Sequence, residues 1–129
     1  MPDQFQAPMM VGTATVFIVR DVAASIVFYR DVLGFKVTFE FGKPTYYVCL
    51  SRDEAALHLM DAKRSPQPPG HGALCVFVRN VDAVHAEFTR SGAKPPKPPQ
   101  DYAYGMRDFD VFDPDGNRMT IGAMSQKPS

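Results

Sequence analysis

The chain contains an internal repeat, and this feature limits the possible folds more than any other. The segment ATVFIVRD begins at Ala14, and the similar segment ALCVFVRN begins at Ala73, 59 residues later (73 − 14). Both are typical of a short apolar strand that ends in valine, arginine and an acidic or amide residue. Because self-similarity at a fixed offset means that one structural unit occurs twice, we expect two copies of the same small motif.

Each repeat continues with a pattern that is typical of a helix. A capping residue opens both helical segments, Asp21 in the first and Asn80 in the second. Apolar residues then recur at helical spacing, and each segment ends at a glycine, which favours the left-handed stop conformation. These positions are Val22, Ile26, Tyr29 and Leu33 before Gly34, and Val81, Val84 and Phe88 before Gly92.

After each helix the apolar spacing becomes alternating, which predicts strands. In the second half, prolines at 95, 96, 98 and 99 distort or replace the first strand, because proline lacks the N–H that a ladder needs. The predicted strands are 36–41, 45–51 and 55–62 in the first half, and 106–113 and 117–124 in the second. The sequence therefore predicts an α+β fold of two tandem βαβββ modules, whose curved mixed sheets form around a cleft.

The length of 129 residues suits a single domain. We expect a first module at 13–62, a linker rich in proline and glycine at 63–72, and a second module at 73–123. A cleft between two curved sheets is where a small apolar or aromatic ligand would bind.

Charge and composition exclude several classes of partner. Lys and Arg number 14 against 14 Asp and Glu, so the chain has no positive excess to attract nucleic acid or an anionic membrane. No apolar stretch approaches the ~20 residues of a membrane-spanning helix, and the N-terminus does not resemble a signal peptide. We therefore expect a cytoplasmic protein, with Cys49 and Cys75 as buried small hydrophobic residues rather than a disulfide.

The segment RDVAASIVFYRDVLGF, residues 20–35, resembles the opening strand and helix of the vicinal-oxygen-chelate superfamily. This group includes glyoxalase I, fosfomycin-resistance proteins, extradiol dioxygenases and bleomycin-resistance proteins. The second half matches in YGMRDF, residues 104–109, and in FDPDGN, residues 112–117. The resemblance covers nearly the whole chain, from about Gly12 to Ala123, and implies the glyoxalase/bleomycin-resistance fold.

The resemblance also implies four positions at which the metal enzymes of this group place their ligands. In this chain they are Ala14 and Ala73 on the first strands, and His58 and Thr120 on the last strands. A methyl group cannot bind a metal, and one imidazole with one hydroxyl does not satisfy a divalent cation. We therefore expect no metal and no other cofactor, as in bleomycin-resistance proteins, which sequester their drug without metal catalysis.

The similarity to bleomycin-resistance proteins implies a metal-independent protein that sequesters a planar or aromatic antibiotic or metabolite. It also implies a homodimer with exchanged arms, for which the linker or the residues before Thr13 could serve. Bleomycin is cationic and its binders tend to be acidic, whereas this chain has a pI of about 6.8, so another apolar metabolite is an alternative ligand.

Two alternative functions stay open. The first is a lyase, isomerase or dioxygenase of the same fold, with His58 acting together with Tyr46, Tyr102 or Asp108. The second is an interaction module that binds no ligand. We assign no catalytic residue.

The candidate ligand-binding residues are mostly aromatic, because flat rings stack on flat ligands. His58 alternates with leucines, so it faces the cleft if those leucines face the helices. By resemblance, Tyr104 corresponds to an aromatic residue that packs against the planar rings of the drug. Arg107 either holds its loop or meets polar groups of a ligand. The predicted set is Phe39, Tyr46, His58, Tyr102, Tyr104, Arg107 and Phe109.

Overall fold

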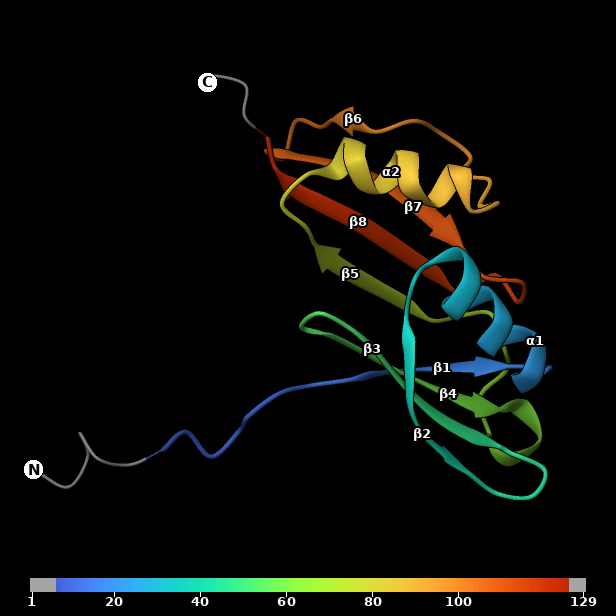
Figure 1. The fold of residues 1–129 in the computed structure, drawn as a ribbon. Helices are drawn as coiled ribbons and strands as arrows, with labels where there is room; N and C mark the ends of the chain where they lie inside the picture. Colours follow the sequence, from blue (N-terminus) through green and yellow to red (C-terminus); the bar gives the residue numbers. More distant parts are fainter. Residues whose placement is uncertain (1–6, 126–129) are drawn as a thin grey trace, which may run out of the picture.

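Two four-stranded sheets carry the fold, one from each half of the chain (Figure 1). A computed structural model of the protein describes residues 7–125. The first half contains β1 (Thr15–Val19), α1 (Val22–Val27), a π-helix (Phe28–Val32), β2 (Lys36–Phe41), β3 (Tyr47–Arg52), β4 (Ala55–Asp61) and a 3-10 turn (Ala62–Arg64). The second half contains β5 (Ala73–Phe77), α2 (Val81–Arg90), β6 (Gln100–Asp101), β7 (Met106–Phe112) and β8 (Arg118–Met124).

The two sheets have the same topology, which confirms the α+β fold and the tandem βαβββ modules. The strand orders are β1-β4-β3-β2 and β5-β8-β7-β6. In each sheet the first strand of the module pairs in parallel with the last, and the other neighbours are antiparallel. The first strand of each module is therefore an edge strand.

Both helices begin at the predicted caps. The side chain of Asp21 accepts a hydrogen bond from the backbone N–H of Ala24, and Asn80 does the same for Ala83, each at 3.0 Å. The first helix differs from the expected single α-helix, because its second part is a wider π-helix. There the N–H of Leu33 bonds to the carbonyl of Phe28 at 3.2 Å, five residues back.

The predicted disruption of the strand after α2 is also confirmed. Only Gln100 and Asp101 pair with β7, and the proline-rich segment before them has no regular structure. Prolines cannot donate to the ladder, so the second sheet has a short edge strand where the first has the full-length β2.

The buried side chains of both modules form one core on the helix side of the sheets. Polar contacts reinforce this junction: the Tyr29 hydroxyl donates to the Asp113 carboxylate at 2.9 Å, and the Asn117 amide donates to the Ile18 carbonyl at 3.1 Å. Arg52 of β3 forms a bidentate ion pair with Glu87 of α2, at 2.7 and 2.8 Å. The two modules are therefore locked together through their helix-covered sides.

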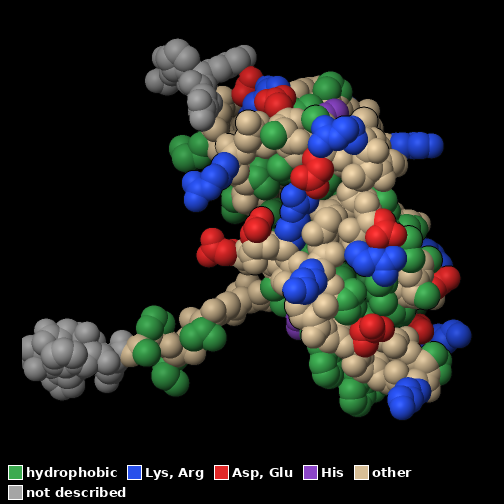
Figure 2. Space-filling view, viewed as in Figure 1, with side chains coloured by type: hydrophobic (Ala, Val, Ile, Leu, Met, Phe, Trp, Pro, Cys, Tyr) green, Lys and Arg blue, Asp and Glu red, His purple; other side chains and the backbone are tan. Residues whose placement is uncertain are grey.

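Residues 7–14 lead into β1 and run away from the body of the domain (Figure 1). Met9, Met10 and Val11 are each more than nine-tenths exposed there. Figure 2 shows hydrophobic side chains along this projecting segment. We call residues 7–14 the N-terminal arm, and its large apolar side chains are open to solvent.

Two further expectations can be compared with the structure. Cys49 and Cys75 are free thiols, but neither is buried as expected. Cys49 is half-buried and Cys75 is exposed, because both lie on the sides of their strands that face away from the core. Within residues 7–125, every helix is too short or too polar to cross a membrane.

Candidate ligand-binding site

Each sheet has one side that no helix covers, and the alternation of the strands decides which side chains lie there. Leu57 and Leu59 are completely buried in the core, so His58 between them lies on the uncovered side of β4. Cross-strand register places Val16 and Cys49 beside His58, and Phe39 beside Cys49. We call this surface the N-terminal face; its side chains are Val16, Phe39, Phe41, Tyr47, Cys49, His58 and Met60.

The second module presents an equivalent surface. Phe109 is buried in the core, so Asp108 and Asp110 on either side of it lie on the uncovered side of β7. Thr120 pairs with Asp110 and with Cys75, and therefore shares that side. We call this surface the C-terminal face; its side chains are Cys75, Phe77, Asp108, Asp110, Phe112, Thr120 and Met124.

Both faces expose large apolar side chains. Phe39 and Phe41 are each 54% exposed and stack on one another with ring centres 6.4 Å apart. On the C-terminal face, Phe77 is 73% exposed and Met124 is 80% exposed. An isolated exposed apolar residue needs no explanation, but a group of them on one uncovered sheet indicates a surface that binds something.

The N-terminal face has a polar pair at its centre. The Tyr47 hydroxyl oxygen lies 2.8 Å from Nδ1 of His58, and the two rings meet edge to face. Burial raises the pKa of Tyr47, with a smaller contribution from the nearby Cys49 thiol. Tyr47 therefore keeps its hydroxyl proton at neutral pH, and this hydroxyl can donate to the imidazole or accept from it.

The C-terminal face has two carboxylates that are held by hydroxyl groups. Tyr104 donates to Asp108, and Thr120 donates to Asp110, each at 2.6 Å. Neither carboxylate forms an ion pair with the residues described. Tyr102 stacks on Tyr104 almost in parallel, with ring centres 5.2 Å apart, so a flat aromatic platform borders the two acids.

The carboxylates shift the titration of their neighbours. The hydrogen bond to Asp108, followed by loss of solvation and the charge of the same carboxylate, raises the pKa of Tyr104 to about 12. Burial, and then the charges of Asp108 and Asp110, raise the pKa of the Cys75 thiol. This face therefore has a negative potential that disfavours further negative charge.

The residues at the four metal-ligand positions do not fit a metal. Ala14 and Ala73 have no donor atom, Nδ1 of His58 is engaged by Tyr47, and the Thr120 hydroxyl donates to Asp110. Between residues 7 and 125, no three His, Cys, Asp or Glu side chains come close enough to hold a metal ion. We derive no chemistry through a metal here.

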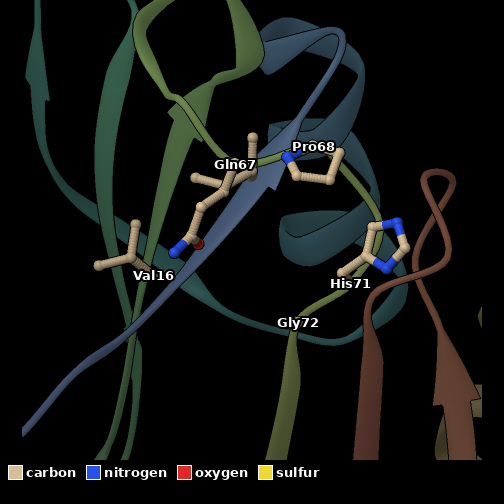
Figure 3. A pocket seen from close by; sticks show the side chains of 6 residues that line it. Val16, Gln67, Pro68, His71 and Gly72 are labelled. Carbon is tan, nitrogen blue, oxygen red and sulfur yellow. The ribbon is translucent and has the colours of Figure 1, made fainter.

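A shallow pocket of about 320 Å³ lies beside the N-terminal face, between β1 and the linker that leads to β5. Figure 3 shows the Gln67 side chain reaching across β1 on one side of the pocket, with His71 on the other side of Pro68. Val16 lines this pocket and is also the register partner of His58.

The structure places the predicted site residues in four different settings. Phe39 and His58 lie on the N-terminal face, and Tyr102 and Tyr104 lie beside the C-terminal face. Tyr46 lies at the end of the β2–β3 hairpin, where its ring packs against Phe41 and lies under the Arg64 guanidinium, 4.0 Å away.

The other two predicted residues lie on the covered side of the second sheet. Arg107 pairs with Asp82 of α2 and with Asp101 of β6, and so ties the helix to the sheet. Phe109 is 2% exposed and packs edge to face against His85 and Phe88 of α2. Phe109 is therefore part of the core, whereas the Arg107 side chain remains 32% exposed while it holds the helix to the sheet.

The predicted set of ligand-binding residues includes Tyr46 but not its neighbour Tyr47. A signal for Tyr47 was present, because β3 and β4 alternate and Leu57 and Leu59 identify the buried side. Setting Tyr47 and His58 on the same side required the register between these strands, which the sequence alone did not provide.

The sequence of the chain matches one family of known proteins. The model of the Glyoxalase/Bleomycin resistance protein/Dioxygenase superfamily matches residues 13–121. Comparison with curated proteins gives no significant match.

Several solved structures are similar to the chain. A glyoxalase/bleomycin resistance protein from Catenulispora acidiphila is 25% identical, with a TM-score of 0.74, over 90% of this chain and 100% of that one. The bleomycin-binding protein from bleomycin-producing Streptomyces verticillus, complexed with copper(II)-bleomycin, is 24% identical, with a TM-score of 0.76, over 92% and 100%. A superfamily member from Sphaerobacter thermophilus is 23% identical, with a TM-score of 0.76, over 89% and 98%. With the family model covering most of its length, the chain belongs to the glyoxalase/bleomycin resistance/dioxygenase superfamily, also called the vicinal-oxygen-chelate superfamily.

Proposed function

We propose that the protein binds and sequesters a flat, partly aromatic small molecule without the help of a metal. The observation that carries this proposal is the pair of uncovered sheet faces, each with exposed aromatic side chains around a small polar centre. Aromatic rings bury a large area at low entropic cost and stack on flat ligands, and the polar groups would orient the bound molecule.

The proposed binding unit is a homodimer in the cytoplasm. The modules of one chain pack through their helix-covered sides, so neither open face is closed by the other module of the same chain. A second copy could cover the N-terminal face of one chain with the C-terminal face of its partner and enclose a cleft. The exposed apolar N-terminal arm would then pack on the partner, as an exchanged arm.

The ligand class follows from the two faces. The solved bleomycin-binding protein was crystallised with copper(II)-bleomycin, and an antibiotic of this kind is one candidate. The neutral overall charge of the chain favours a less cationic compound, whereas Asp108 and Asp110 provide acceptors for ligand N–H groups. A flat antibiotic or metabolite that contains both apolar rings and polar edges fits these groups.

A thermal-shift screen of flat aromatic compounds tests this proposal. A compound that binds only the folded state must raise the melting temperature by mass action, about 2.7 kcal/mol of stabilisation at a concentration of ~100 Kd. We expect stabilisation by compounds with fused aromatic rings, at one site per cleft by calorimetry. The absence of stabilisation by any flat compound at millimolar concentration would contradict the proposal.

A second candidate is an enzyme of the same fold, such as a lyase, an isomerase or a dioxygenase. One observation favours it: Tyr47 and His58 form a hydrogen-bonded pair on an open face, a geometry that can move a proton. Elemental analysis of the purified protein tests the metal-dependent form of this candidate. Close to one zinc, nickel, iron or manganese per chain would favour the enzyme, and we expect none at this stoichiometry.

A further inference from the structure

On the N-terminal face, the side chains of Tyr47 and His58 have a defined orientation relative to each other. The two residues lie on neighbouring strands, where Tyr47 pairs with Met60 and His58 pairs with Cys49. Their ring centres are 5.4 Å apart at 75°, and Oη of Tyr47 meets Nδ1 of His58 at 2.8 Å. Because β3 and β4 are both interior strands of the sheet, the orientation of the imidazole is set by the scaffold.

The direction of this hydrogen bond determines where the imidazole carries its proton. Burial raises the pKa of Tyr47, so its hydroxyl remains protonated near neutral pH and can donate to Nδ1. A neutral imidazole that accepts at Nδ1 must carry its hydrogen on Nε2. A Tyr47 hydroxyl that donates to Nδ1 would therefore make the far nitrogen of His58 a donor.

The Nε2 atom is available to a ligand. Among residues 7–125, every side-chain nitrogen or oxygen that is buried has a hydrogen-bond partner. Nε2 of His58 has no such partner in this part of the chain, so it is not buried and is open to solvent. Val16, directly beside His58 on β1, lines the shallow pocket of Figure 3. His58 itself does not line this pocket, which borders the N-terminal face through Val16.

The surroundings indicate which acceptor this donor would take. The other side chains of the N-terminal face are apolar or uncharged, so an anion would lose its hydration there without gaining an opposite charge. A ligand amine would find no acceptor at Nε2–H. A neutral oxygen acceptor avoids both problems, because it loses little hydration free energy on binding and accepts a hydrogen bond from Nε2–H.

We propose that Tyr47 holds His58 as an Nε2–H donor that recognises a carbonyl oxygen on the edge of a flat ligand, such as a quinone or an acridone. This inference rests on the proposed function and names the ligand class for the same site. His58 is the residue that contacts the ligand, and Tyr47 is a positioning residue.

Nitrogen-15 NMR of the imidazole ring tests the positioning in the ligand-free protein. We expect the parent at neutral pH to show His58 as the Nε2–H tautomer, and Tyr47→Phe to show a mixture of both tautomers. A Nδ1–H tautomer in the parent, or an unchanged tautomer in Tyr47→Phe, overturns the proposal. This measurement needs no ligand and does not depend on whether a His58 variant folds.

Two fluorescent probes with the same three-ring frame test whether His58 recognises a carbonyl oxygen. Acridone has a carbonyl where 9-aminoacridine has an amino group. We expect His58→Phe to weaken acridone binding about tenfold, the effect of one lost hydrogen bond, and to leave 9-aminoacridine unchanged. Tyr47→Phe should weaken acridone binding by a smaller factor, whereas Val27→Ala, at a half-exposed residue of α1 outside the N-terminal face, should change the binding of neither probe.

The outcomes separate this proposal from the proposed function. If His58→Phe weakens both probes equally, or neither, the protein still binds flat molecules but His58 does not recognise a carbonyl. If the parent binds neither probe at millimolar concentration, the proposed function and the carbonyl recognition are both overturned.

Discussion

The hydroxyl of Tyr104 donates a 2.6 Å hydrogen bond to Oδ2 of Asp108, a carboxylate that is only 8% exposed. The Tyr104 ring is itself 66% exposed, so an open aromatic surface is tied at its edge to a buried acid. This contact fixes a ring that the loop would otherwise leave free to rotate. The contact also couples the ionisation of the Tyr104 phenol to the Asp108 carboxylate. A titration of Tyr104 therefore reports on the contact.

Titration of tyrosinate absorbance should show Tyr104 ionising near pH 12 rather than near its ordinary pKa of 10.0. The folded pKa is raised, so the contact contributes stability below pH 10 that is lost as pH rises from 10 towards 12. Subtracting the Tyr104→Phe titration isolates this group. Asp108→Asn should return the pKa towards 10.0, and Asp110→Asn, at a more distant carboxylate, should change it much less. Ionisation of Tyr104 near pH 10 in the parent would contradict the hydrogen bond.

The ring of Tyr104 should matter for binding. We expect Tyr104→Ala to weaken binding of a flat probe such as acridone by ~10- to 100-fold, because a stacked aromatic contact is lost. Tyr104→Phe keeps the ring and should bind nearly as well, but it removes the donor to Asp108 and should lower the melting temperature by a few degrees. Fluorescence titration and thermal unfolding measure both effects. Full binding by Tyr104→Ala would remove Tyr104 from the site.

The buried hydroxyl of Tyr29 should stabilise the junction of the modules. Tyr29→Phe leaves the buried Asp113 carboxylate without one of its donors, and we expect a loss of about 1–3 kcal/mol in urea unfolding. Tyr46→Phe is the matched control, because the Tyr46 hydroxyl makes no hydrogen bond to the residues described. Equal stability of the two variants would show that the Tyr29–Asp113 contact contributes nothing.

The ion pair between Arg52 and Glu87 should make stability depend on pH. The hydrogen bond from Arg52 lowers the pKa of Glu87 below its ordinary 4.5, despite the opposing effect of burial. The pair therefore stabilises the fold above pH 4.5, and this contribution is lost as pH falls through the lowered folded pKa.

We expect Glu87→Gln to cost about 1 kcal/mol at pH 7 and to cost much less at about pH 3, as measured by urea unfolding. The exposed pair of Arg30 and Asp31 provides a control, because these residues are neighbours in sequence and Asp31→Asn breaks no contact between the modules. A cost for Glu87→Gln that is the same at both pH values would exclude the ion pair as its source.

Much of the fold could be predicted because its signals are local. The two similar strand segments, the caps Asp21 and Asn80 and the alternating strands each depend on a few neighbouring residues, and the structure confirms them. The change from α- to π-helix at Phe28 was not predicted, since the same apolar spacing suits both helices over so few turns.

The site was harder to predict because side-chain surroundings depend on contacts between distant segments. Phe109 and Asp108 are adjacent, yet one lies in the core beneath α2 and the other on the open face. Arg107 faces α2 only because that helix packs on β7 and brings Asp82 to it. The sequence suggested aromatic and charged candidates, but the sheet register decides which of them a ligand could reach.

The N-terminal arm provides the last prediction, which concerns the dimer. Val11 is 92% exposed, so Val11→Asp should not affect the fold of one chain. If the arm packs on a partner, a carboxylate at this position would be buried without a countercharge, and the dimer should dissociate at least tenfold more readily.

Val27→Asp makes the same change at a half-exposed residue of α1 and should leave dimerisation intact. Light scattering at micromolar concentration should give twice the 14.3 kDa of one chain for the parent and for Val27→Asp, and a lower mass for Val11→Asp. A parent mass of 14.3 kDa would refute the dimer, and a dimer unaffected by Val11→Asp would show that the arm takes no part in it.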